Sequence, residues 1–176
     1  LLTSELTFDI TMGDIAFALA FGTDIGVANN HKNIPSILAM IMKYSIELLY
    51  SVPTTHLSLI NFVKNKKGAD LSSLKLIMSG GDRFPWQMVK DYKMLSKESH
   101  FYNVYGPTEV TINCFSIRLD DKIEMLLKKN KPVPIGNCFD SLDYILLNDE
   151  KISNQEGELC IIGQQIMLGY HGELKK

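Results

Sequence analysis

Apolar and polar positions alternate between helical and strand-like patterns over the first two-thirds of the chain. Helices are expected at residues 11–21, 35–44, 54–63 and 86–95. Apolar strands are expected between them at residues 25–28, 46–51, 74–78 and 101–105. Thr11 or Asp9 would begin the first helix, which reads as buried, and Thr54 or Thr55 would cap the third. This alternation predicts an α/β fold with a parallel sheet and helices on both faces.

The pattern changes after about residue 116. Lys122 to Lys131 is a charged stretch that favours an exposed helix or loop. Strands are expected at 142–147 and 158–162, joined by a polar turn at 148–157, with 163–170 a candidate for another strand. Such short consecutive strands indicate antiparallel pairing, as in part of a small β-barrel. We therefore divide the chain into an α/β subdomain at 1–115 and a partial β-barrel subdomain at 116–176.

Composition excludes several classes of protein. The 176 residues are 45% hydrophobic and 22% charged, with a formal net charge of -2, so nothing favours nucleic acid or an anionic membrane as partner. Apolar runs are too short for a membrane span, and no signal peptide is visible. The three cysteines and four histidines are too scattered for a disulfide framework or a metal site, which favours a cytoplasmic protein with reduced thiols. The chain starts at Leu1 without an initiator Met and ends at Lys176, so we expect it to be a piece of a longer chain.

Three polar or glycine-rich turns follow predicted strands, at residues 51–54, 79–82 and 105–109. Because the carboxyl ends of parallel strands lie at one edge of the sheet, a ligand is expected there. The segment Asn103 to Glu109 combines a ring, a hydroxyl and a carboxylate. A ring can lie on a base, a hydroxyl can bond a phosphate oxygen, and a carboxylate can hold a hard cation. The alternative is an ordinary Gly-Pro turn.

The segment Asn103 to Glu109, N-V-Y-G-P-T-E, resembles the signature of the adenylate-forming superfamily. More narrowly, it resembles amino-acid adenylation domains of nonribosomal peptide synthetases and D-alanine–carrier-protein ligases. Phe8 to Thr11 is similar to the Phe-Asp-x-Ser element of those domains, and Ile77 to Asp82 to the strand and turn beneath adenine. The barrel motifs are matched by residues 134–136, 157–163 and 168–170. The four ordered resemblances cover essentially the whole chain.

The resemblance implies a two-step reaction that uses ATP and Mg²⁺. An amino-acid carboxylate would attack the α-phosphorus of ATP, giving an aminoacyl adenylate and pyrophosphate. The aminoacyl group would then pass to the phosphopantetheine thiol of a carrier protein. Positioning and charge stabilisation would dominate such catalysis.

The same resemblance implies the nucleotide site. Tyr105 would stack on adenine, Asn103 would bond its edge, Thr108 would bond a phosphate oxygen and Glu109 would hold Mg²⁺. Thr108 and Glu109 are thus the catalytic candidates, with Glu109 also the metal ligand. The cofactor-binding candidates are Gly80, Gly81, Asp82, Asn103, Tyr105, Gly106 and Thr108. The alternatives are a core aromatic for Tyr105, a helix-start carboxylate for Glu109 and an N-cap for Thr108.

The resemblance also implies that Asp9 pairs with the α-ammonium group of the substrate. Family members that activate fatty or aryl acids have no ammonium to pair, and a buried carboxylate without a partner is costly. The alternative is that Asp9 caps the first helix. Gly13 would leave room for a substrate side chain, which we expect to be polar and medium or large. The substrate-binding candidates are Asp9, Ile10, Gly13, Tyr50, Ile77, Ser79, Val104, Ile112 and Asn113.

Several parts of the family's machinery are expected outside these residues. They are the phosphate loop with its lysine, the aspartate that binds ribose, and the C-terminal lid domain with its lysine. These residues alone are therefore expected to be nearly inactive. Two other readings stay open: a nonenzymatic binding module with the same fold, and an acyl-CoA or aryl-acid ligase of the superfamily.

Overall fold

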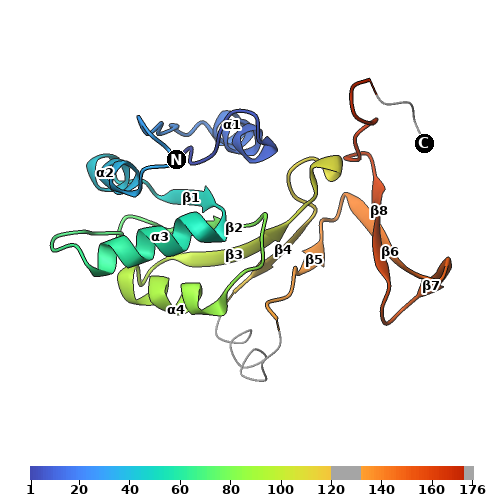
Figure 1. The fold of residues 1–176 in the computed structure, drawn as a ribbon. Helices are drawn as coiled ribbons and strands as arrows, with labels where there is room; N and C mark the ends of the chain where they lie inside the picture. The colour runs from blue at the N-terminus through green and yellow to red at the C-terminus, as the bar shows by residue number, and fades with distance from the viewer. Residues whose placement is uncertain (120–131, 173–176) are drawn as a thin grey trace.

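The computed structural model describes residues 1–119 and 132–172, and the charged stretch predicted at 122–131 lies outside them. The described residues form a mostly parallel sheet flanked by helices, followed by a small antiparallel sheet (Figure 1). The predicted α/β class is therefore confirmed, and the described strands form no closed barrel. None of the described helices is long and apolar enough to cross a membrane.

The first sheet has five strands in the order β1-β2-β3-β4-β5. The three parallel strands are β1 (Leu48–Ser51), β2 (Leu76–Ser79) and β3 (His100–Tyr105). Antiparallel strands β4 (Phe115–Arg118) and β5 (Asn137–Cys138) complete it. Ser51 pairs with Ser79, and Ser79 pairs with Asn103. The turns that follow the three parallel strands therefore begin at the same edge of the sheet.

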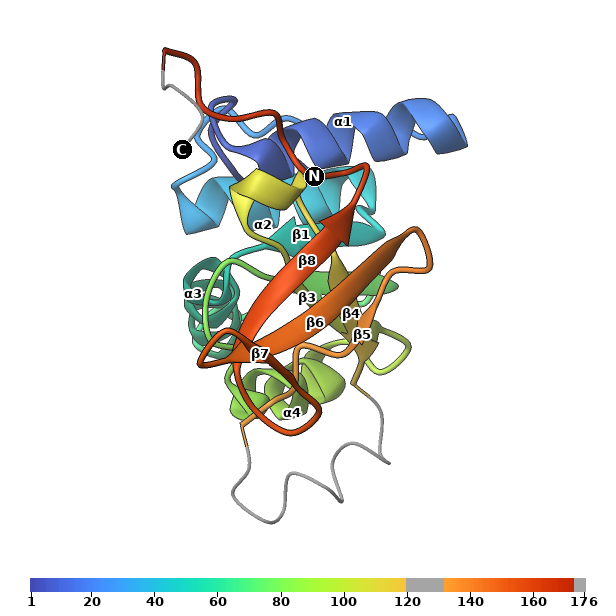
Figure 2. The same cartoon turned by 90° about the vertical axis from the view of Figure 1, so that its right-hand side faces the viewer.

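Within the described residues, four α-helices accompany this sheet. They are α1 (Asp9–Phe21), α2 (Ile34–Tyr44), α3 (Pro53–Lys64) and α4 (Trp86–Leu95). Figures 1 and 2 show α3 and α4 side by side along the sheet, with α1 and α2 beyond β1. A salt bridge of 2.7 Å between Lys64 and Asp91 joins α3 to α4. The main core lies beneath these two helices, around Leu59, Ile77 and Phe101.

Helix α1 begins at Asp9, one of the two predicted starts, but no side chain caps it, and the predicted cap of α3 is wrong. Phe8 occupies the N-cap position of α1, and the Thr11 hydroxyl instead donates to the Glu5 carbonyl at 2.9 Å. Helix α3 begins at Pro53, whose fixed φ and missing N–H suit the first helical position, so Thr54 and Thr55 lie inside its first turn. Capping depends on where the chain enters a helix, which local sequence leaves open at these two sites.

Two further expectations for the N-terminal region are also wrong. Helix α1 is not buried within the described residues, because only Thr11 and Ala18 are buried while Leu19 is 80% exposed. Instead of a strand at 25–28, the structure has one isolated parallel bridge between Leu2 and Val27. Among the described residues, the backbone of 25–28 forms only this bridge, so no strand forms there.

A buried histidine links α3, α4 and β2. The His56 ring lies 2.9 Å from the Tyr92 hydroxyl through Nδ1 and 3.0 Å from the Met78 carbonyl through Nε2. Burial lowers the pKa of His56 to about 4, so the ring is neutral at pH 7. A neutral ring that donates from Nε2 to the carbonyl can accept the Tyr92 hydroxyl hydrogen at Nδ1, which satisfies all these polar groups.

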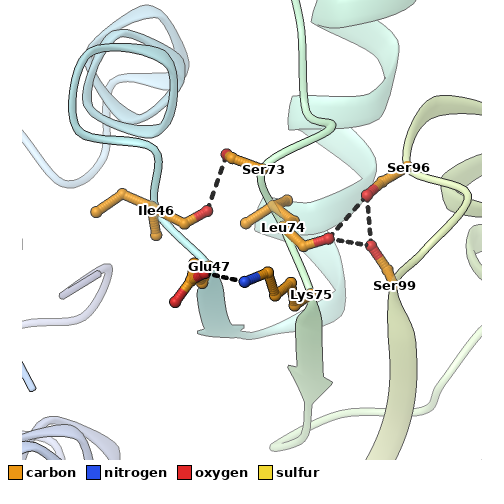
Figure 3. A network of polar contacts seen from close by, with 7 residues as sticks. All are labelled: Ile46, Glu47, Ser73, Leu74, Lys75, Ser96 and Ser99. Atoms are coloured by element: carbon orange, nitrogen blue, oxygen red, sulfur yellow. Dashed lines mark hydrogen bonds and ion pairs between the residues drawn. The ribbon is translucent and has the colours of Figure 1, made fainter.

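Serine hydroxyls fix the opposite end of the parallel strands (Figure 3). The Leu74 carbonyl accepts from Ser96 at 2.9 Å and from Ser99 at 2.6 Å, and Ser73 donates to the Ile46 carbonyl at 2.9 Å. Because Ser96 and Ser99 border the turn between α4 and β3, these bonds hold the start of β3 beside the start of β2. The alignment of the strands is thereby set at the edge away from the polar turns.

The second sheet has the order β7-β6-β8 and is antiparallel. Its strands are β6 (Leu142–Asn148), β7 (Lys151–Ser153) and β8 (Glu158–Gly163). Strand β7 lies inside the segment predicted as a turn, where Asp149 and Glu150 adopt left-handed backbone conformations and reverse the chain. The candidate strand at 163–170 does not form beyond Gly163.

Candidate functional site

The turns after β1, β2 and β3 meet at one edge of the sheet. A Cβ atom added to Gly80 would lie 2.7 Å from the Val104 carbonyl oxygen and 3.4 Å from the Tyr50 hydroxyl. A Cβ atom on Gly106 would lie 2.3 Å from the Ile112 carbonyl oxygen. Only glycine fits at these two positions, because backbone from the adjoining segment lies against each of them. The glycines thus allow three chain segments to pack closely around the site.

Helix α1 and the residues after η1 (Thr108–Val110) contribute to one side of this site. The Tyr50 hydroxyl donates to Asn113 Oδ1 at 2.9 Å. Burial raises the pKa of Tyr50 to about 12, and the negative charges of Asp14 and Asp9 add to the rise. The first turns of α1 therefore lie near the end of β1, and Asp9 has no hydrogen-bond or ion-pair partner within the described residues.

Ile112 occupies the space beside Gly13. A Cβ atom on Gly13 would lie 3.2 Å from both Cδ1 and Cγ2 of Ile112. The room that the sequence suggested at Gly13 is therefore filled in this structure by the Ile112 side chain. The two residues are brought together across α1 and the loop that follows η1, so the size of the pocket depends on where Ile112 is held.

The remaining pocket candidates have different surroundings. Ser79 and Val104 are buried at the ends of β2 and β3, and Ser79 Oγ has no hydrogen-bond partner in the part of the chain that the structure describes. Ile77 belongs to the main hydrophobic core. Ile10 lines a separate cavity of about 580 Å³ together with Phe8 and His31. Most of the predicted pocket residues therefore lie close together, whereas Ile77 lies in the core and Ile10 lines the other cavity.

A cavity of about 480 Å³ lies between the turn after β2 and the turn after β3. Tyr105 is 37% exposed, with its ring edge-on to Phe115 at 6.3 Å between centroids. Asn103 Nδ2 already donates to the Pro134 carbonyl at 2.8 Å. The cavity lining includes Gly81, Asp82, Asn103, Val104, Tyr105, Gly106 and Pro107. An exposed ring next to glycine backbone is a suitable surface for a flat heterocycle such as adenine.

Glu109 stands at the exposed start of the 3₁₀ turn η1. Its own backbone N–H and then the Tyr170 hydroxyl, which donates to Oε1 at 2.8 Å, lower the pKa of Glu109. An ionised, accessible carboxylate fits a hard cation such as Mg²⁺. The described residues contain no cluster of three carboxylate, histidine or cysteine side chains. A Mg²⁺ ion here would therefore take most of its ligands from phosphate oxygens and water.

Thr108 is exposed beside Glu109, and Pro107, rather than Thr108, occupies the N-cap position of η1.

Sequence reasoning missed two side chains near this site. Asp14 is half-buried, and desolvation raises its pKa to about 6. The amide nitrogen of Gln165 lies within hydrogen-bonding distance of three carbonyl oxygens around the loop of Ile112 and Asn113. Asp14 follows Asp9 by five residues, and a second carboxylate so close to Asp9 in the sequence was a visible signal. No local pattern indicates the long-range contacts of Gln165.

An α/β sheet with glycine-rich turns at the carboxyl ends of its parallel strands is typical of enzymes that bind a ligand at that edge. The profile of the AMP-binding enzyme family matches residues 1–171, and the chain belongs to that family. This family comprises adenylate-forming enzymes, and the resemblance seen in the sequence is confirmed.

Curated relatives include peptide synthetases and a carrier-protein ligase. Tyrocidine synthase 3 of Brevibacillus parabrevis is 28% identical over 96% of this chain and 2% of its own length. The D-alanine--D-alanyl carrier protein ligase of Bacillus licheniformis is 25% identical over 97% of this chain and 34% of its own length. The chain thus spans about a third or less of these relatives.

Solved structures share the fold. The crystal structure of IdnL7 superposes with a TM-score of 0.79 at 27% identity, over 94% of this chain and 33% of that one. A long-chain-fatty-acid-CoA ligase from Archaeoglobus fulgidus has a TM-score of 0.77 at 19% identity, over 94% of this chain and 34% of its own. The second likeness concerns the fold alone, so the fold does not distinguish amino acids from other acid substrates.

Proposed function

We propose that these residues form the core of an ATP-dependent ligase that adenylates an amino acid and passes it to a phosphopantetheine thiol on a carrier protein. The proposal assigns the acid to the side of the site formed by α1, β1 and the loop after η1. It assigns the nucleotide to the cavity beside Tyr105. The acid carboxylate would meet the α-phosphate where these two sides join, near Gly80 and Gly106.

The observation that carries the proposal is the environment of Asp9. Its carboxylate is half-buried near the Tyr50 hydroxyl and has no cationic partner within the described residues. Asp14 is a second acidic residue whose negative charge acts on the Tyr50 hydroxyl. An α-ammonium group would offset this charge, whereas a fatty or aryl acid would bring no cation. The electrostatics therefore favour an amino acid over a neutral acyl chain.

The proposed substrate side chain is polar. Ser79 Oγ is buried without a partner, and a substrate donor or acceptor would satisfy it. Ile112 takes up the space beside Gly13, which favours a medium side chain over a large one. A protein that activates only alanine or glycine would contradict this part of the proposal.

On the nucleotide side, we propose that the chain's residues bind and orient. Tyr105 would offer its ring to adenine, and Gly80 and Gly81 would let the backbone come close to the base. Thr108 would donate its hydroxyl hydrogen to a phosphate oxygen, while Glu109 would hold Mg²⁺, which offsets phosphate charge. Asn103 could contribute its carbonyl oxygen to the adenine edge, since its amide N–H is engaged with Pro134.

The test is ATP–pyrophosphate exchange by the intact protein that contains these residues, with Mg²⁺ and each amino acid in turn. Asp9→Asn should raise the KM for the amino acid by about a hundredfold, the loss expected when a desolvated ion pair is broken. Asp24→Asn, an exposed carboxylate beyond the end of α1, is the matched control and should change little. Normal exchange by Asp9→Asn would contradict the assignment.

The main rival is an acyl-CoA or aryl-acid ligase, which shares this fold. It predicts exchange with fatty or aryl acids, insensitive to Asp9→Ala. A nonenzymatic binding module predicts nucleotide or amino-acid binding without exchange in the intact protein. The same assay, extended to these acids and combined with calorimetric binding of ATP, separates the three.

A further inference from the structure

Gln165 donates hydrogen bonds to one short loop. Its Nε2 lies 2.7 Å from the Val110 carbonyl oxygen, 2.8 Å from that of Thr111 and 2.6 Å from that of Asn113, so its two N–H groups serve three acceptors, one of them shared. In return, Thr111 Oγ1 donates to the Gln165 carbonyl at 2.8 Å. An amide side chain from the segment after β8 therefore satisfies carbonyls that no strand or helix serves.

The loop that Gln165 contacts has an unfavourable backbone. Thr111 and Ile112 have φ angles of 53° and 72°, in the left-handed region that β-branched residues rarely adopt. Such conformations persist only where surrounding contacts hold them. The Gln165 bonds flank both residues, and the Met167 N–H donates to the Glu109 carbonyl at 2.8 Å just before them.

This strained loop carries two walls of the pocket. Ile112 packs over Gly13, and Asn113 accepts the Tyr50 hydroxyl hydrogen. If the loop relaxed to ordinary φ values, both side chains would leave these positions. Gln165 does not line the cavity beside Tyr105, and the loop that it contacts meets this lining only at Gly106.

We propose that Gln165 is a positioning residue that determines recognition of the acid: it holds Ile112 and Asn113 in the pocket wall and leaves nucleotide binding to other residues. The inference rests on the proposed function for its effect on substrate, but the bracing of the loop is independent of it. Through Gln165, the segment after β8 sets the shape of a pocket formed mainly by the first sheet and α1.

The experiment compares Gln165→Met, which keeps the length of the side chain and removes its donors, with Gln164→Met. Gln164 is the exposed neighbour, so the control makes the same substitution one residue away. Hydrogen exchange by mass spectrometry is measured on the peptide that covers residues 108–114. The KM values for the amino acid and for ATP are measured by pyrophosphate exchange in the intact protein.

The expected result is at least about tenfold faster exchange of the 108–114 amides in Gln165→Met, since both N–H donors to the loop carbonyls are lost. The KM for the amino acid should rise by about tenfold or more, while the KM for ATP stays within about twofold. Gln164→Met should match the wild type in all three measurements. Gln165→Glu, which keeps the shape but presents an acceptor to the carbonyls, should behave like Gln165→Met.

Unchanged amide exchange in Gln165→Met would contradict the claim that Gln165 holds the loop. Equal rises in both KM values would contradict the claim that Gln165 acts on recognition of the acid and not of ATP. If none of the amino acids supports pyrophosphate exchange by the wild type, the proposed function fails. Hydrogen exchange alone then shows whether Gln165 holds the loop. If Gln165→Met does not fold, Thr111→Val removes one bond of the same set with little change of shape. The exchange of its 108–114 amides and its KM values for the amino acid and for ATP are then judged by the same criteria.

Discussion

Tyr50 and Asn113 are 63 positions apart in the sequence, and the Tyr50 hydroxyl donates to Asn113 Oδ1 at 2.9 Å. The bond joins the end of β1 to the loop after η1 and lies on the side of the site assigned to the acid. Tyr50→Phe removes the bond and keeps the ring. We expect a loss of about 1 kcal/mol in stability and a rise of about fivefold in the KM for the amino acid.

Thermal unfolding and pyrophosphate exchange measure these two effects of Tyr50→Phe. Tyr44→Phe is the control, because Tyr44 is 56% exposed at the end of α2. A larger effect on the KM for ATP than on that for the amino acid would place Tyr50 on the nucleotide side, against our assignment.

The buried His56 predicts a pH-dependent stability. Its pKa falls from the usual 6.5 to about 4 in the folded protein, since burial disfavours the charged ring. The unfolded chain therefore binds the proton first as the pH falls. This contribution to stability is fully present above pH 6.5 and is lost as the pH falls toward about 4. The total loss is about 3 kcal/mol.

Urea unfolding between pH 4 and pH 7 tests the His56 prediction. His56→Gln should be less stable at pH 7 and should show a shallower dependence on pH in this range. His171→Gln, at an exposed position, should keep the slope of the wild type. Equal slopes for His56→Gln and the wild type would assign the acid sensitivity to other groups.

Glycine at position 106 is required by close packing of backbone. A Cβ atom there would lie 2.3 Å from the Ile112 carbonyl oxygen and 2.5 Å from Asn113 Cα. Gly106→Ala should cost roughly 3 kcal/mol in stability, because backbone cannot move aside as a side chain can. Gly26→Ala is the control, since its added methyl group would meet only side-chain ends, the nearest at 3.1 Å. Chemical denaturation of both variants measures the difference, and similar losses would contradict the packing argument.

Glu109 is proposed to hold Mg²⁺. Glu109→Gln should raise the Mg²⁺ concentration needed for half-maximal exchange by about tenfold, because a neutral amide binds a hard cation less well. Stability should change little, since the carboxylate is exposed. Glu158→Gln is a control at another exposed position. An unchanged Mg²⁺ requirement in Glu109→Gln would remove Glu109 from the proposed metal site.

Local patterns predicted the elements better than they predicted the contacts of the site. The α4 bounds, Trp86 to Leu95, agree with the sequence, because its apolar periodicity and the preceding Pro85 are local signals. The polar turns after β1, β2 and β3 were also expected at one edge, because parallel strands leave no other arrangement. These features need no knowledge of distant residues.

Features that depend on distant residues were not predicted. The Gln165 side chain bonds carbonyls 52 to 55 positions away, and a glutamine in a polar segment has no distinctive local signature. Helix α1 begins at Asp9, one of the two predicted starts, but the contact of the Thr11 hydroxyl with the Glu5 carbonyl was not predicted, for the same reason. Polar side chains have several possible partners, and tertiary packing chooses among them.

Ser51 and Ser79 give a matched pair for the last prediction. They are paired in register at the ends of β1 and β2, and both are fully buried. Ser51 Oγ accepts from Thr3 Oγ1 at 3.0 Å, whereas Ser79 Oγ has no partner among the described residues. A buried hydroxyl without a partner reduces stability, so Ser79→Ala should be neutral or stabilising by about 1 kcal/mol. Ser51→Ala should instead destabilise by about 1 kcal/mol, because it removes the contact between two buried hydroxyls and leaves Thr3 with the Tyr50 carbonyl, at 2.9 Å, as its acceptor.

The same pair separates a structural role of Ser79 from a role in recognition. If the Ser79 hydroxyl forms a hydrogen bond with a polar group of the substrate, Ser79→Ala should raise the KM for the amino acid by about fivefold or more. The protein should be no less stable. A loss of recognition with no loss of stability is not explained by a damaged fold. Ser51→Ala should show the reverse, with lower stability and a nearly unchanged KM. If Ser79→Ala binds its amino acid as well as the wild type does, Ser79 does not contact the substrate and the preference for a polar side chain loses its main support.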